Sequence, residues 1–383
     1  MSSPAVAVPP TSPAILLVST ADTDLLAARA AAEGYRVANP ARVPDEDLAA
    51  LLDGVGVAVV RLLGGARVWE RGLAALARAG IPALVLGGEA TPDADLMALS
   101  SVPLHVVAEA SRYLIAGGPE NLARLARYLR ATVLAPADAE PGGEPEPPLP
   151  MPEFGVHSGY GVPTERKRPT VGVVYYRAHE LSGNTAFVET LCDALDAAGA
   201  DPLPVFCGSL RTLSDTDGLV GLLQDCDALI ATVLAGGGTV AADASAGGDE
   251  GAWDVGALAA LDIPVLQGLC LTTSRAHWQD SDAALSPMDA AMQVAIPEFD
   301  GRLITVPFSF KETGPDGLTS YVTDPERTAR VAGIAVKHAA LRHVPAGERR
   351  VALMLSAYPT KHARIGNAVG LDTPASVVAL LAA

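Results

Sequence analysis

Short hydrophobic runs alternate with amphipathic stretches along the first third of the chain. The apolar runs predict buried strands at Ala14–Val18, Val55–Arg61 and Ile81–Leu86. Spacings of three and four residues predict helices at Asp22–Glu33, Arg67–Ala79 and Pro119–Ala131, the first two ended by Gly34 and Gly80. Because strands that alternate with helices form parallel, doubly wound sheets, residues 14–134 are expected to form one α/β module.

The same alternation returns in the middle of the chain. Strands are predicted at Val171–Tyr176, Leu203–Phe206, Ala228–Val233, Ile263–Gln267 and Leu303–Val306, and helices at Asn184–Ala198 and Pro325–Leu341. Residues 170–345 are therefore expected to form a second doubly wound, parallel-sheet module. Residues 135–169 are rich in Pro, Gly and Glu without periodicity, which predicts a poorly ordered, protease-sensitive linker between the modules.

Residues 348–383 are expected to be the truncated start of a third domain. Val351–Leu355 is predicted to be a strand, and a helix is predicted to begin at Pro374 with Thr373 as its N-cap. That helix would be cut off at Ala383. The predicted fold class is α/β, with two doubly wound parallel-sheet modules plus the start of a third domain.

Composition limits the classes of partner and the cellular compartment expected for this protein. The 383 residues carry a net charge of −17, which argues against nucleic acid and anionic membranes as partners. The four cysteines form no CxxC pair, so free thiols in a reducing compartment are expected rather than a zinc site or disulfides. Without a ~20-residue apolar run or a signal peptide at the N-terminus, a cytoplasmic protein is predicted.

One glycine-rich loop resembles a phosphate-binding loop only in part. Gly236-Gly237-Gly238-Thr239 follows a predicted strand, but the chain contains neither GxxxxGK[ST] nor GxGxxG. Such a loop lacks the lysine that holds the β- and γ-phosphates, so ATP binding by this chain is not expected.

Several polar residues could carry chemistry. Arg177 and His179 follow a strand end, where doubly wound sheets place ligands, although a lone histidine is commonly structural. Asp249 and Trp253 either face a large flat ligand or, for the carboxylate, favour the positive end of a helix. Glu298 and Asp300 either shape a turn or suit proton removal and metal coordination.

The densest polar stretch runs from Ser356 to Asn367. Its Lys361, His362, Arg364 and Asn367 could bind carboxylate or amide side arms of a ligand, and the alternative is an inter-domain contact. Since His179 and this stretch both follow strand ends, we expect His179, Glu298 and Lys361–Arg364 to lie on the same side of the subunit, with Glu298 the weakest member.

Seven stretches resemble a known family over nearly the whole chain. The family is the large subunit of aerobic cobaltochelatase, a relative of the porphyrin-binding subunit of magnesium chelatase. The similar stretches are Val60–Gly65, Tyr175–His179, Ser182–Thr185, Ser245–Asp249, Gln267–Cys270, Ile296–Gly301 and the most specific one, Tyr358–Ser376.

The resemblance implies an activity. The family's large subunit binds a tetrapyrrole, hydrogenobyrinic acid a,c-diamide, and receives Co²⁺ as the substrate metal in aerobic cobalamin (vitamin B12) biosynthesis. Two AAA+-type partner subunits hydrolyse ATP with Mg²⁺, which this chain would not bind. The family's subunit is longer, so this chain is expected to be its N-terminal part and to be inactive alone.

The resemblance also selects site residues, all of which except Trp253 lie in the matching stretches. The implied substrate-binding residues are Arg177, His179, Asp249, Trp253, Lys361, His362, Arg364 and Asn367. Catalytic residues are unassigned, with Glu298, Asp300 and His179 as candidates, and no metal ligand is assigned. Two alternatives stay open: a magnesium chelatase large subunit acting on protoporphyrin IX, and a non-catalytic, two-lobed module that binds a small ligand.

Overall fold

The computed structural model describes residues 13–89, 93–136, 145–163, 167–208, 210, 218–233, 259, 261–355, 366 and 370–382, and the backbone of 238–240 and 252–254. The chain divides into two compact units, Met1–Ala340 and Leu341–Ala383. The larger unit contains both main sheets. The predicted boundaries at 134, 170 and 345 remain predictions.

The first sheet is parallel throughout, as the sequence pattern predicted. Its strands run in the order β2-β1-β3-β4, with bounds β1 (Ala14–Ser19), β2 (Tyr35–Ala38), β3 (Val55–Leu62) and β4 (Ala83–Gly87). Its helices are α1 (Asp22–Ala30), α2 (Leu48–Leu52), α3 (Glu70–Ala79), α4 (Ala94–Met97), α5 (Leu104–Ala116) and α6 (Pro119–Thr132). Alternate strand residues enter two cores, one of which packs α1, α5 and α6 against the sheet.

Two helix predictions in this module were incomplete. Helix α1 ends at Ala30, earlier than predicted, and Ala32 rather than Gly34 is the first residue after it with a positive φ, at 55°. Helix α5 was not predicted, although it contributes Val107, Ala110 and Tyr113 to the core. Gly80 ends α3 in the left-handed conformation, as predicted.

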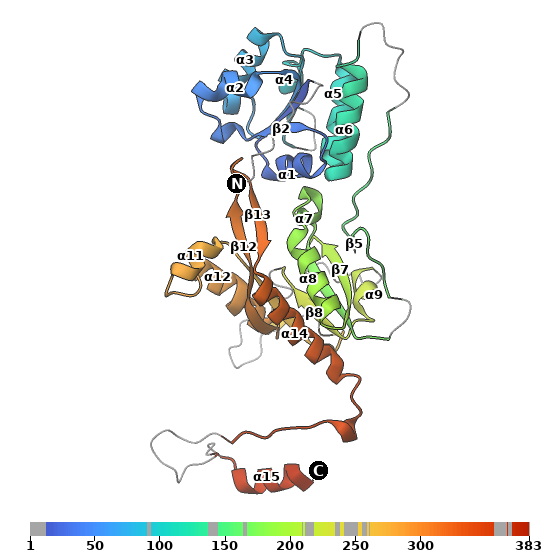
Figure 1. Cartoon of the computed structure of the whole chain (residues 1–383), viewed down its shortest axis with the longest axis vertical. Coiled ribbons are helices and arrows are strands. Elements are labelled where there is room, and N and C mark those ends of the chain that lie inside the picture. The colour runs from blue at the N-terminus through green and yellow to red at the C-terminus, as the bar shows by residue number, and fades with distance from the viewer. Residues whose placement is uncertain are drawn as a thin grey trace, which may run out of the picture. The chain divides into compact units, whose positions relative to one another are not determined.

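The second sheet has seven strands in the order β13-β12-β11-β8-β6-β7-β5. Figure 1 labels its two edge strands, β13 and β5, on opposite sides of the sheet. Its five central strands are parallel, namely β6 (Thr170–Tyr176), β7 (Asp201–Cys207), β8 (Ala228–Ala231), β11 (Val265–Leu271) and β12 (Leu303–Thr313). The edge strands β5 (Phe154–Val156) and β13 (Thr319–Thr323) are antiparallel to their neighbours, which the sequence pattern did not predict. The α/β class is confirmed.

Seven described helices flank this sheet, and the sequence pattern predicted only the second and the last of them. The seven are α7 (Arg177–Ser182), α8 (Ala186–Ala197), α9 (Leu219–Leu223), α11 (Arg275–Asp280), α12 (Pro287–Ala290), α13 (Ile296–Phe299) and α14 (Pro325–Leu341). The bounds of α14 match the prediction at both ends. A separate antiparallel pair joins β9 (Gly238–Val240) to β10 (Ala252–Asp254).

The β12–β13 hairpin joins the two modules. Strand β12 extends to Thr313, seven residues beyond its predicted end, and the turn after it carries Leu318 into the core of the first module. Asp316 in the same turn forms an ion pair with Arg29 of α1, at 2.7 Å. A hairpin from one module therefore completes the core of the other.

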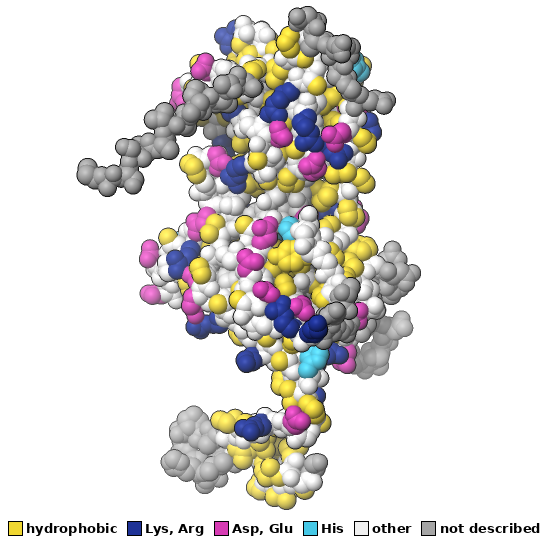
Figure 2. Space-filling view, turned by 45° about the vertical axis from the view of Figure 1, so that its right-hand side comes forward, with side chains coloured by type: hydrophobic (Ala, Val, Ile, Leu, Met, Phe, Trp, Pro, Cys, Tyr) yellow, Lys and Arg dark blue, Asp and Glu magenta, His cyan; other side chains and the backbone are white. Residues whose placement is uncertain are grey.

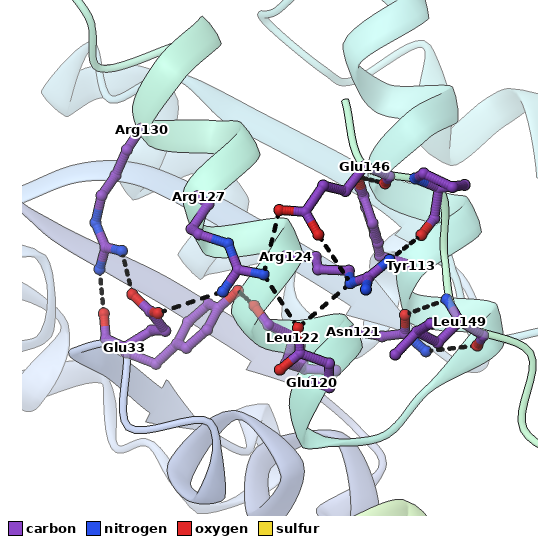
Figure 3. Close-up of polar contacts among 12 residues, drawn as sticks. Glu33, Tyr113, Glu120, Asn121, Leu122, Arg124, Arg127, Arg130, Glu146 and Leu149 are labelled. Atoms are coloured by element: carbon purple, nitrogen blue, oxygen red, sulfur yellow. Dashed lines mark hydrogen bonds and ion pairs between the residues drawn. The ribbon is translucent and has the colours of Figure 1, made fainter. Parts of the chain in front are cut away.

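Part of the predicted linker lies against the first module. Residues 145–149 run beside α5 and α6, where Asn121 exchanges two hydrogen bonds with the backbone of Leu149, at 2.8 and 2.9 Å (Figure 3). Tyr113 donates a hydrogen bond to the carbonyl of Glu146. Because the linker contributes mainly backbone groups to these contacts, the pattern of side chains along the sequence does not predict them.

Arginines on α6 make a network of ion pairs at this place. Arg127 lies 3.1 Å from Glu120 and 3.7 Å from Glu146, and Arg130 pairs with Glu33 (Figure 3). Figure 2 shows basic and acidic side chains interspersed on the face that it draws. The charge on this face is therefore locally compensated, in spite of the net charge of −17.

The smaller unit corrects two predictions. Val351–Leu355 is not a strand, and Val351 and Met354 are 89% and 88% exposed. An apolar run becomes a strand only where a neighbouring strand pairs with it, and the described residues provide none here. Helix α15 (Thr373–Ala382) forms as predicted, but its cap is Asp372, whose carboxylate accepts from the N–H of Ala375.

Candidate functional site

Helix α7 follows β6 directly and brings three polar side chains to the carboxyl end of the second sheet. It spans only Arg177–Ser182 and ends at Gly183, which has a φ of 64°. Carboxyl ends of parallel strands form the ligand-binding edge of doubly wound sheets. The predicted residues Arg177 and His179 are therefore at such an edge, together with Glu180, which the sequence pattern did not single out.

His179 lies among aromatic rings. Its ring centroid is 5.0 Å from that of Phe187 and 5.4 Å from that of Tyr321, both in edge-on geometry. Burial, with a smaller contribution from Lys311, lowers the pKa of His179 to about 4. The imidazole is consequently neutral near pH 7, the form that can accept a proton or bind a metal.

Glu180 is the centre of a polar cluster that sequence reasoning missed. Its Oε2 accepts a hydrogen bond from the hydroxyl of Tyr175, at 2.6 Å, and lies 2.8 Å from Nδ1 of His157. The other ring nitrogen of His157 lies 3.5 Å from Glu189. We call His157, Tyr175, Glu180 and Glu189 the Glu180 cluster.

The Glu180 cluster favours the charged forms of His157 and Glu180 in partly buried surroundings. The hydrogen bond to Glu180 raises the pKa of His157, although burial opposes this. Burial alone would raise the pKa of Glu180, but the hydrogen bonds from His157 and Tyr175 outweigh it and lower that pKa. His157 stands in the predicted linker at no recognisable spacing from Glu180, so only the fold brings them together.

Arg177 forms hydrogen bonds with the backbone of the predicted linker. Its Nε donates to the carbonyl of Pro152, at 2.7 Å, and its Nη2 donates to that of Met151, at 2.8 Å. About a quarter of its side chain, 23%, remains exposed. The guanidinium thus has a structural role and still reaches solvent.

Asp300 and Glu298 lie in contrasting surroundings. Asp300 pairs with Arg302 at 2.7 Å, and both side chains are fully buried. Arg302 also donates to Gln267 and to the carbonyl of Val233, each at 2.7 Å. Glu298 is exposed on α13. The pair that looked equivalent in sequence therefore contains one carboxylate in a core ion pair and one on the surface.

A short π-helix precedes this pair. Residues Ala291–Ala295 adopt π geometry between α12 and α13, and the side chain of Gln293 accepts a hydrogen bond from Gln267, at 3.1 Å. Such π turns are often found at functional sites. Gly301 ends α13 with a φ of 71°, so the predicted turn before β12 is a helix end.

The remaining predicted residues fall outside the part of the chain that the structure describes. They are Asp249, Lys361, His362, Arg364 and Asn367, and of Trp253 only the backbone is described, in β10. The shared side for His179, Glu298 and Lys361–Arg364 therefore stays a prediction. Within the described ranges, no three His, Cys, Asp or Glu side chains are grouped as a metal site, and no helix is long and apolar enough to cross a membrane.

Comparison with known proteins identifies the family of this chain. A family model described as CobN/Magnesium Chelatase matches residues 111–383. The chain belongs to the CobN/magnesium chelatase family. The aerobic cobaltochelatase subunit CobN of Pseudomonas aeruginosa is 34% identical over 378 residues, which cover 93% of this chain and 30% of that protein. A magnesium-chelatase subunit of Rhodobacter capsulatus is 25% identical over 287 residues, covering 68% of this chain and 24% of that protein.

A solved structure from the family is similar over most of the chain. The catalytic subunit of cobaltochelatase from Mycobacterium tuberculosis is 51% identical, with a TM-score of 0.85, and the match covers 96% of this chain and 30% of that one. The chain thus spans about 30% of the length of these cobaltochelatase relatives. The resemblance read from the sequence is confirmed at the level of the CobN/magnesium chelatase family.

The buried imidazole predicts a pH dependence within this family fold. A histidine whose pKa is about 4 when folded and about 6.5 when unfolded binds its proton first in the unfolded chain. Its contribution to stability is complete above about pH 6.5 and is lost as the pH falls towards 4. As the pH falls from about 6.5 towards 4, the free energy of unfolding of His179→Phe should therefore decrease less than that of the wild type. Urea unfolding at a series of pH values measures this difference. Parallel profiles would contradict the assignment.

Proposed function

We propose that this chain is part of the large, tetrapyrrole-binding subunit of a cobaltochelatase that inserts Co²⁺ into hydrogenobyrinic acid a,c-diamide in cobalamin biosynthesis. The observation that carries the proposal is the 51% identity, with a TM-score of 0.85, to the catalytic subunit of a cobaltochelatase. The magnesium-chelatase relative is only 25% identical, which favours cobalt and a corrinoid over magnesium and protoporphyrin IX.

The proposal includes ATP-dependent partners. Metal insertion forms nitrogen–metal bonds, for which the ring must lose two N–H protons and the ion must lose water. Two AAA+-type subunits would supply the energy by hydrolysing ATP with Mg²⁺. The absence of a complete phosphate-binding loop from the sequence supports placing ATP on those partners rather than on this chain.

The proposed substrate contacts keep the residues selected from the sequence. They are Arg177, His179, Asp249, Trp253, Lys361, His362, Arg364 and Asn367. His179 is proposed to contact the substrate as a neutral imidazole, because burial disfavours its protonated form. The exposed carboxylate of Glu298 suits proton removal from a pyrrole nitrogen. Asp300 is proposed to position its loop through Arg302, because its carboxylate is already paired and buried.

Reconstitution tests the proposal. The full-length subunit, combined with its two partner subunits and ATP, should convert hydrogenobyrinic acid a,c-diamide to its cobalt form, followed by absorbance. The same mixture with Mg²⁺ and protoporphyrin IX should give little product. Preferential magnesium insertion would support the magnesium chelatase alternative, and tetrapyrrole binding without insertion of either metal would support a non-catalytic module.

The polar stretch near the end of the chain predicts a binding defect. Arg364→Ala in the full-length subunit should weaken corrinoid binding roughly 10- to 150-fold, the loss expected for one charge-assisted hydrogen bond of about 1.5–3 kcal/mol. The matched control is Arg330→Ala, because Arg330 forms an exposed pair with Glu326 on α14. Equal affinities for both variants would assign Arg364 a structural role.

A further inference from the structure

The carboxyl edges of the two sheets meet at a small cavity. Its volume is about 200 Å³, and its walls include Thr23, Asp24, Arg61 and Gly118 of the first module with Arg177 and Ala178 of α7. Arg61 belongs to β3, and α7 follows β6, so both modules contribute the strand ends at which doubly wound sheets bind ligands. The proposed function gives Arg61 no role.

The cavity favours a negatively charged group. Two arginines line it against one aspartate, and that aspartate is already engaged by Arg61, at 3.0 Å, and by the hydroxyl of Ser19, at 2.6 Å. The guanidinium of Arg61 is further fixed by the carbonyls of Gly88 and Leu114, at 3.0 and 3.3 Å. A guanidinium held in this way is oriented before any ligand arrives.

Arg177 supplies the donor for that group. Its Nε and Nη2 bind the carbonyls of Pro152 and Met151, whereas Nη1 has no partner among the described residues. Glu153 competes weakly, because it lies 4.0 Å from Nη2 and is 82% exposed. The N-terminal turns of α1 and α6, represented in the wall by Thr23 and Gly118, add the positive ends of two helices.

The size of the cavity limits the ligand. A volume of about 200 Å³ is below the range of roughly 300–1,000 Å³ found for sites of drug-sized ligands. A tetrapyrrole ring does not fit, but an acetate or propionate group does. We propose that the cavity between Arg61 and Arg177 binds one carboxylate, either the end of a tetrapyrrole side arm or a small free carboxylic acid.

Assigning the carboxylate to a tetrapyrrole side arm rests on the proposed function. The existence of a carboxylate site does not rest on it. Isothermal titration of the full-length subunit at low ionic strength, with sodium propionate and separately with hydrogenobyrinic acid a,c-diamide, distinguishes the two sources. Arg177→Gln removes the free donor, and Ala178→Phe fills the cavity while leaving Arg177 in place. The control is Arg330→Gln, because the Arg330 side chain is exposed on α14 and lies outside the cavity. Melting temperatures check that each variant is folded.

We expect both cavity variants to lose roughly tenfold or more in affinity for at least one titrant, and the control to lose none. Weakened corrinoid binding identifies a side arm as the ligand. Weakened propionate binding with unchanged corrinoid binding identifies a free carboxylic acid. If the cavity variants lose propionate binding while the full-length wild-type subunit binds no corrinoid, the carboxylate site stands and the proposed function fails. Unchanged binding in both variants, or no binding of either titrant by the wild type, overturns the inference.

Discussion

Replacing Arg302 with leucine is expected to lower the free energy of unfolding by about 3–5 kcal/mol, because Asp300 would be left as an unpaired buried charge. Both side chains of this ion pair are fully buried, and the guanidinium also binds Gln267. Urea unfolding of the full chain, followed by circular dichroism, measures the change.

Two further variants make this test specific. Arg330→Leu removes a charge from an exposed pair on α14 and should change stability by less than about 1 kcal/mol. The double variant Asp300→Leu/Arg302→Met removes both buried charges and should recover much of the loss. If Arg302→Leu were as stable as the wild type, the Asp300–Arg302 pair would not be buried in solution.

Truncating Leu318 to alanine should cost about 2–5 kcal/mol, the range for deleting a buried leucine side chain. Leu318 is 2% exposed and belongs to the first module's core, although its hairpin comes from the second sheet. The loss should therefore be accompanied by faster proteolysis between the modules. Limited proteolysis and thermal unfolding of the same preparation measure both effects.

Matched substitutions separate packing from local strand effects. Leu318→Met keeps the side-chain volume and should cost less than about 1.5 kcal/mol. Val322→Ala lies on the same hairpin, where Val322 is 50% exposed, and should have a small effect. If Leu318→Ala were no more destabilising than Val322→Ala, the hairpin would not be docked in the first module.

Both experiments concern contacts between segments that are distant in sequence. Arg302 reaches the carbonyl of Val233 across 69 positions, and Asp316 reaches Arg29 across 287. Two residues of the predicted linker, Glu146 and His157, add contacts to α5 and to α7. We infer that the two sheets of the larger unit are held together at several points, rather than by a single flexible connection.

The sequence by itself determined the class of the fold and most of its central strands. Val171–Tyr176, Leu203–Phe206 and Ala228–Val233 are apolar on both faces, as strands covered by helices on both sides must be, so they could be recognised locally. The start of α14 at Pro325 was readable for a similar reason, since proline is favoured in a first helical turn. The resemblance to the chelatase family was likewise carried by local stretches of sequence.

Only the tertiary structure decided which polar residues meet. Glu298 and Asp300 are two positions apart, yet one is exposed and the other is buried against Arg302, because residues i and i+2 at a helix end do not share a face. His157 and Glu180, separated by a predicted linker and a strand, lie 2.8 Å apart. Val351–Leu355 shows the reverse: its pattern is that of a strand, but a strand is completed by hydrogen bonds to a neighbour, and no local pattern specifies that neighbour.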